Sequence, residues 1–146
     1  MECVIKKVIE ELNPQIILFY SPSEKEFAKN FHSRLADSKN IFSNIETTSI
    51  RELAMLISNC DIFFGNEGGP RHIAQSLDIP SFAIFSSKSS KKEWLANPSK
   101  KHQGVEPRDI YPECHLLSYK DCYSLIKPDY VVDKIKELYL QYCRNM

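Results

Sequence analysis

The stretch Ser58–Ser87, SNCDIFFGNEGGPRHIAQSLDIPSFAIFSS, decides the fold. Two apolar runs of strand type, Cys60–Phe64 and Ser81–Phe85, flank a glycine-rich turn and a helical stretch that Pro70 opens. Three of the chain's four glycines fall within the turn, between Gly65 and Gly69. This order of strand, turn, helix and strand predicts a βαβ unit with a parallel pair of strands.

The residue types in the turn suit a ligand. Gly68 and Gly69 leave room for a ligand beside the main chain. The N–H groups and the positive dipole end of the following helix would face an anion or a sugar oxygen. Glu67 stands before the helix as an acceptor for hydroxyls, and Arg71 and His72 are donors in its first turn. The alternative is a tight structural turn with a helix cap, and the pattern alone favours neither.

The rest of the chain continues the alternation of strands and helices. Ile16–Tyr20 is an apolar run typical of a buried parallel strand, and Ile41–Phe42 begins a short, weak one. Phe27, Phe31 and Leu35 are spaced by four and predict the buried stripe of a helix. We expect residues 1–146 to form a single three-layer, Rossmann-like α/β domain with about four or five strands in a mostly parallel sheet. Residues 86–128 show no clear periodicity and are expected to be irregular, ahead of a C-terminal helix.

Three loops should meet at one edge of that sheet. In parallel α/β sheets, ligands bind beyond the carboxyl ends of the strands. The loops Ser21–Glu24, Asn66–Pro70 and Ser86–Ser90 follow the predicted strands at that edge. Their convergence predicts a binding site around Glu67.

Composition excludes several functions. The 146 residues carry 19 basic and 19 acidic side chains, so net charge does not indicate a nucleic-acid or membrane-surface partner. No apolar run approaches the ~20 residues that span a bilayer, and no signal peptide is recognisable, so we expect a cytoplasmic protein. The five cysteines should stay reduced there. A zinc site can be drawn from four side chains, but their spacing fits no common zinc pattern, so no metal is expected: His102, Cys114, His115 and Cys122.

The central motif resembles a known family. GNEGGPRHIAQSLDIPSFAIF resembles the C-terminal signature of glycosyltransferase family nine, the heptosyltransferase family, and the likeness extends over roughly residues 45–140. Three residues depart from the family pattern: Glu67 replaces an Asp, Gly68 a hydroxyl residue and Arg71 an apolar one. The positions that match in register are Gly65, Asn66, Gly69, Pro70, His72, Ala74 and Pro80.

The resemblance implies the GT-B arrangement, in which two Rossmann-like domains face a cleft. The C-terminal domain holds a nucleotide-activated sugar, typically ADP-heptose, and the other domain holds the acceptor and usually supplies the catalytic carboxylate, without a metal or other cofactor. By that likeness Glu67 meets the donor sugar hydroxyls. The other expected donor contacts are Gly68, Gly69 and His72 to the diphosphate or the sugar, Arg71 close to the diphosphate, Thr48 and Ser49 near the base, and Glu24 or Glu26 near the ribose.

The resemblance covers only part of that C-terminal domain. The family's first strand of the domain would precede Met1, the acceptor domain is missing, and no catalytic residue is assigned. Two functions stay open. One is the donor-binding domain of a glycosyltransferase of lipopolysaccharide or surface-glycan synthesis, whose full-length enzyme could associate peripherally with a membrane. The other is a non-catalytic nucleotide or nucleotide-sugar binding module, with an epimerase-like domain as a third alternative.

Overall fold

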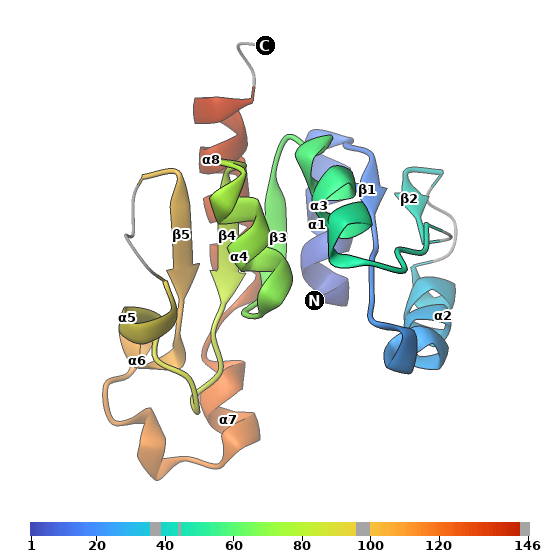
Figure 1. The fold of residues 1–146 in the computed structure, drawn as a ribbon. Coiled ribbons are helices and arrows are strands. Elements are labelled where there is room, and N and C mark those ends of the chain that lie inside the picture. The colour runs from blue at the N-terminus through green and yellow to red at the C-terminus, as the bar shows by residue number, and fades with distance from the viewer. Residues whose placement is uncertain (36–38, 44, 96–99, 144–146) are drawn as a thin grey trace.

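The computed structural model describes residues 1–35, 39–43, 45–95 and 100–143, along which helices and parallel strands alternate (Figure 1). The elements, with η for a 3-10 helix, are α1 (Glu2–Leu12), β1 (Ile16–Ile17), η1 (Pro22–Glu24), α2 (Lys25–Arg34), β2 (Ile41–Phe42), α3 (Ile50–Ser58), β3 (Phe63–Asn66), α4 (Gly69–Ser76), β4 (Ser81–Ile84), α5 (Lys91–Trp94), β5 (His102–Val105), α6 (Pro107–Ile110), η2 (Cys114–Leu116), α7 (Tyr119–Ser124) and α8 (Pro128–Tyr142).

The strands form two sheets, and every pair is parallel. The larger sheet has the order β3-β4-β5, with Phe63 opposite Ser81 and Ser81 opposite His102. The smaller sheet joins β1 to β2, with Ile16 opposite Ile41. This confirms the predicted α/β class and the predicted parallel βαβ unit around Asn66–Pro70. It also places β1 and β3 in different sheets.

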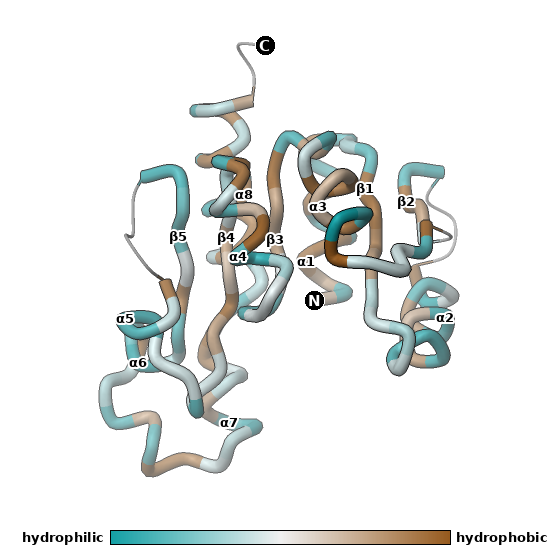
Figure 2. The backbone as a smooth tube through the Cα atoms, in the orientation of Figure 1, coloured by the Kyte–Doolittle hydropathy of each residue, from teal (hydrophilic) through white to brown (hydrophobic). Residues whose placement is uncertain are grey.

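Helices cover both faces of the strands. In Figure 1, α4 lies in front of the larger sheet and α8 behind it, while α3 and α1 lie, one in front of the other, between β3 and β1. The apolar sides of α1 and α8 pack on one another and on Phe82 and Val105 of the sheet. On the other face, Ile57 of α3 and Ala74 of α4 pack with Phe63. Figure 2 shows that β1 and β3 are among the most apolar segments. Each large apolar side chain buried in this way contributes about 1.5–3 kcal/mol.

Two expectations about individual elements are wrong. The strand β3 begins at Phe63 rather than Cys60, because the Cys60 N–H donates to the Ile57 carbonyl (3.0 Å) and continues the turn that ends α3. Leu35, which directly follows α2, is buried as predicted, but Phe27 in α2 is 67% exposed. The spacing of Phe27, Phe31 and Leu35 predicts that they share one side of the helix, but it does not show whether another element covers that side.

The segment 86–128 is more regular than predicted. It contains β5 and several short helices, and β5 extends the sheet beside β4. Gly104 of β5 lies opposite Ala83, and a Cβ at Gly104 would stand 2.7 Å from the Phe85 ring. Gly104 leaves room for the Phe85 ring beside β5. The β5 sequence HQGV therefore lacks the apolar pattern that marks a strand. Within the described residues, no helix is both long and apolar enough to cross a membrane.

Candidate functional site

The glycine-rich turn lies at the carboxyl end of β3 and starts α4. The Glu67 N–H donates to the Ile84 carbonyl (3.0 Å), which holds the turn against β4. Gly68 then takes φ 152° and ψ −175°, a conformation essentially restricted to glycine. Gly68 is the N-cap residue of α4, whose first turn begins at Gly69 beyond the end of β3. A shallow hollow of about 180 Å³ opens there, lined by Glu67, Gly68, Gly69, Arg71, His72 and Trp94.

Glu67 joins two of the three predicted loops. Its Oε1 accepts a hydrogen bond from the Ser89 hydroxyl (2.8 Å). Ser89 also accepts from the Ser86 N–H (3.2 Å), which orders the loop after β4. The other carboxylate oxygen remains an acceptor that a ligand hydroxyl can use. Sequence analysis missed Ser89, and its place in a serine-rich loop at the same edge was the signal that could have found it.

Arg71 is fully buried and is one of the residues that line the hollow. Its Nη1 donates to Gln75 Oε1 (2.8 Å) and its Nη2 donates to the Trp94 carbonyl. The guanidinium lies over the Phe85 ring, 5.9 Å from its centroid, and Nε has no hydrogen-bond partner. Burial lowers the pKa of Arg71, and Glu67 opposes that shift. Arg71 thus supports the floor of the site and ties α5 to α4.

His72 stands at the surface of the same hollow. Its Nε2 lies 2.8 Å from Arg71 Nη2, and its ring meets Trp94 edge-on with centroids 6.3 Å apart. Desolvation and the neighbouring Arg71 charge lower the pKa of His72, against an opposing effect of Glu67. The imidazole is therefore neutral at pH 7, when it can donate one hydrogen bond and accept another.

Tyr123 is a second residue that sequence analysis missed. Its hydroxyl donates to Asn66 Oδ1 (3.2 Å), which brings α7 to the end of β3. Burial raises the pKa of Tyr123, and the negative charge of Glu67 acts in the same direction. Tyr123 belongs to residues 86–128, which were expected to be irregular, so the sequence offered no reason to place it beside Asn66.

The remaining predicted contacts lie outside the small hollow. Thr48 and Ser49 begin α3: the Thr48 N–H and hydroxyl donate to Glu52 Oε2 (2.6 and 2.9 Å), and the Glu52 N–H donates to Ser49 Oγ (3.2 Å). Glu24 accepts from the Ser21 hydroxyl (2.6 Å) and N–H (3.1 Å), and these bonds lower its pKa. Glu24 lines a second, larger cavity that also reaches Glu67.

The zinc grouping drawn from the sequence does not form. His102 lies beside Ser81 and Asp78, whereas Cys114 is buried against Cys122. Burial and the contact with Cys122 raise the pKa of Cys114 to about 11, so it stays a thiol at neutral pH. In the part of the chain that the structure describes, no three His, Cys, Asp or Glu side chains are placed to hold a metal ion.

Comparison with known proteins identifies the family. The sequence profile of glycosyltransferase family 9 (heptosyltransferase) matches residues 4–123. Lipopolysaccharide heptosyltransferase 1 of Campylobacter coli is 28% identical over 137 residues, which cover 92% of this chain and 40% of that protein. Lipooligosaccharide heptosyltransferase 2 of Campylobacter jejuni subsp. jejuni serotype O:6 is 26% identical over 129 residues, covering 85% of this chain and 41% of that protein.

The chain thus spans about 40% of the length of the curated relatives it matches. No solved structure matches it significantly. The family match includes the glycine-rich turn, the first turn of α4 and the loop that carries Ser89, so it covers the site described above. On the profile match and the parallel α/β fold together, the chain belongs to glycosyltransferase family 9, the heptosyltransferase family.

Proposed function

We propose that residues 1–146 form the donor-binding domain of a heptosyltransferase of lipopolysaccharide or surface-glycan synthesis, and that the donor is a nucleotide-sugar of the ADP-heptose type. The observation that carries the proposal is the hollow at the carboxyl end of β3. There the Glu67 carboxylate, the two glycines and the first turn of α4 face one space. A diphosphate suits the helix end, and a sugar suits the carboxylate. The names of the curated relatives supply the reaction class.

Each side chain then has a role that follows from its chemistry. Glu67 accepts hydrogen bonds from neighbouring sugar hydroxyls. The N–H groups of Gly68 and Gly69, with His72, bind the diphosphate, since no Cβ obstructs close approach. The buried Arg71 acts through its positive charge in the lining of the hollow and keeps its hydrogen bonds to Gln75 and Trp94.

The nucleoside lies farther along the same edge in this proposal. Glu24 contacts the ribose, and the start of α3 at Thr48 and Ser49 lies near the base. Ser49 is the N-cap of α3, and the Thr48 N–H and hydroxyl both donate to Glu52, so these bonds fix both residues at the start of the helix. Acceptor binding and the catalytic carboxylate belong to polypeptide outside residues 1–146, so the purified chain should bind donor without transferring the sugar.

Calorimetric titration of the purified chain tests the proposal. The ligands are ADP-glucose, UDP-glucose and GDP-mannose, each paired with its free nucleoside diphosphate. We expect saturable binding that is tighter for the ADP-sugar than for ADP, because only the sugar reaches Glu67. Absence of saturable binding for every ligand at about 1 mM, which corresponds to about −4 kcal/mol, would reject the donor-binding role.

A further inference from the structure

Trp94 is an exposed aromatic residue in the wall of the hollow. It is 51% exposed and lines the hollow together with Glu67 and the first turn of α4. It is also the only tryptophan among the 146 residues. The face of an aromatic ring carries partial negative charge, so Trp94 does not suit the diphosphate that we assign to the N–H groups of Gly68 and Gly69. Its ring is available for an uncharged part of a ligand.

The short helix α5, which carries Trp94, is anchored at both ends. At its start, the Lys91 N–H donates to a side-chain oxygen of the buried Glu106 (2.8 Å). At its end, Leu95 is buried in the apolar cluster beside β4, and the buried Arg71 donates to the Trp94 carbonyl. The main chain of Trp94 is therefore fixed before a ligand binds, which lowers the entropic cost of stacking on its ring.

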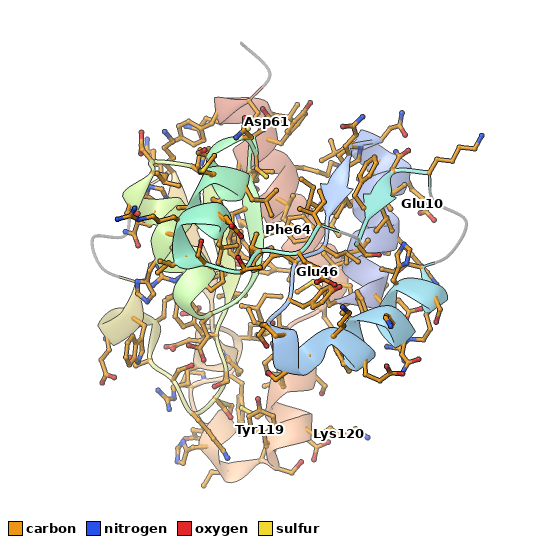
Figure 3. The ribbon with its side chains drawn as sticks, turned by 45° about the vertical axis from the view of Figure 1, so that its right-hand side comes forward. Glu10, Glu46, Asp61, Phe64, Tyr119 and Lys120 are labelled. Atoms are coloured by element: carbon orange, nitrogen blue, oxygen red, sulfur yellow. The ribbon has the colours of Figure 1, made fainter. Side chains whose placement is uncertain are left out.

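The indole keeps an open face. The Trp94 and His72 rings meet edge-on, at 69° with centroids 6.3 Å apart, and such a contact covers at most one face. Tyr119 of α7 provides a contrast, because it is equally exposed (52%) but lies outside the hollow, at the end of the molecule that α7 forms in Figure 3. The Tyr119 ring stacks on Tyr123 (centroids 6.0 Å apart), and Lys88 Nζ lies 5.5 Å from its centroid.

The size and the polar groups of the hollow select the kind of ring that it accommodates. Its volume of about 180 Å³ is smaller than the roughly 300 Å³ of pockets that enclose a drug-sized ligand, so it fits one ring rather than a whole nucleotide-sugar. The positive charge of Arg71 in its lining disfavours a cation. A sugar ring fits both remaining features, because its C–H faces pack on an aromatic face and its edge hydroxyls donate to a carboxylate such as Glu67.

We propose that Trp94 is a specificity-determining residue whose indole stacks on one C–H face of the donor sugar ring, while Glu67 binds hydroxyls at the edge of the same ring. This inference deepens the donor-binding function proposed above and rests on it. The sugar, and not the base or the diphosphate, makes the contact with the indole. Because the two side chains recognise different parts of one ring, each contributes to the affinity for the sugar.

The fluorescence of the single tryptophan of the native chain gives the first test. The emission is excited at wavelengths where adenine does not absorb, and its quenching by acrylamide measures how accessible the indole is. We expect saturating ADP-glucose to lower the quenching constant by about half, because the sugar covers one of the two faces of the ring. Saturating ADP should leave the quenching constant nearly unchanged.

Calorimetric titration of three variants gives the second test. Trp94→Leu removes the aromatic face and keeps an apolar side chain, so it should weaken ADP-glucose binding about threefold or more and leave ADP binding within about twofold of the native value. Trp94→Phe keeps an aromatic face and should retain most of the affinity. Tyr119→Leu is the matched control, since it removes an equally exposed aromatic ring outside the hollow, and it should change neither affinity.

Three results would overturn the proposal. If ADP-glucose binds the native chain without changing the quenching constant, or binds Trp94→Leu as tightly as the native chain, Trp94 only packs on His72 and the donor-binding function stands without it. If ADP protects the indole as well as ADP-glucose does, the base stacks on Trp94 instead. If neither ligand binds the native chain, the donor-binding function and the Trp94 contact fail together. The quenching measurement needs no variant, so it decides the matter even where Trp94→Leu does not fold.

Discussion

At the scale of single residues, Arg71 shows how the fold accommodates a residue that differs from the family pattern. A charged side chain has entered a position that the family resemblance assigns to an apolar one, and it is fully buried. Two of its nitrogens bond Gln75 and the Trp94 carbonyl, and Nε has no partner. Its aliphatic stem packs like an apolar residue, so the fold tolerates the change.

Substitutions at Arg71 should separate the stem from the charge. We expect Arg71→Met to change the unfolding free energy by less than about 1 kcal/mol, because it keeps the volume and removes the unpartnered Nε. Arg71→Ala should cost about 2–4 kcal/mol through lost packing. Urea unfolding followed by circular dichroism measures both. A loss for Arg71→Met as large as that for Arg71→Ala would show that the hydrogen bonds to Gln75 and Trp94, not the stem, hold this region.

At the scale of elements, the glycine-rich turn provides a matched pair. Gly68 has φ 152°, whereas Gly69 begins α4 and has open space around a built Cβ. We expect Gly68→Ala to destabilise the fold by about 1–3 kcal/mol because alanine rarely adopts that φ. Gly69→Ala should change stability by less than about 1 kcal/mol. The difference in melting temperature between the two variants measures this, and similar melting temperatures would contradict a strained turn.

The same elements show what the sequence could predict. The βαβ unit was predictable because Gly68, Gly69 and Pro70 mark a strand-to-helix turn between two apolar runs. The strand β5 was not, because its HQGV sequence gains its place from pairing with β4 and from the fit of Gly104 against Phe85. The site residues also differ in how far the sequence could predict them. Glu67 and His72 were predictable from the motif, whereas Ser89 and Tyr123 reach it only through tertiary contacts.

At the scale of the whole molecule, His102 makes the stability of the fold depend on pH. It is buried on β5, 3.1 Å from Ser81 Oγ and 3.5 Å from an Asp78 oxygen. Burial lowers its pKa, with Asp78 opposing the shift and Lys101 adding to it. The unfolded chain therefore binds more protons than the folded one as the pH falls below about 6.5. The stability that His102 contributes is present above that pH and is lost progressively through the lowered pKa.

The corresponding measurement is the unfolding free energy at about pH 7.5 and about pH 5.5. We expect the native chain to lose stability between them, and His102→Gln to lose less. The pKa of His72 is also lowered, so His72 contributes to the loss of stability at the lower pH, and His102→Gln keeps that contribution. His115→Gln, at an exposed position, is the comparison for a simple loss of an imidazole. An unchanged pH dependence in His102→Gln would contradict the assigned role of its burial.

The central claim is that the Glu67 carboxylate binds the sugar of a nucleotide-sugar. The competing explanation is that Glu67 only holds the loop after β4 through Ser89. Ser89→Ala removes that loop contact and keeps the carboxylate, whereas Glu67→Gln removes the charge. Glu67→Asp restores the residue that the family resemblance expects and should keep binding.

Calorimetric titration of these variants with ADP-glucose and with ADP is therefore the most direct test. A hydrogen bond to a charged group contributes about 1.5–3 kcal/mol, so Glu67→Gln should weaken ADP-glucose binding about tenfold or more and leave ADP binding nearly unchanged. Ser89→Ala should affect neither strongly. Equal losses for ADP-glucose and ADP in Glu67→Gln, or a Ser89→Ala loss as large as that of Glu67→Gln, would contradict the sugar contact.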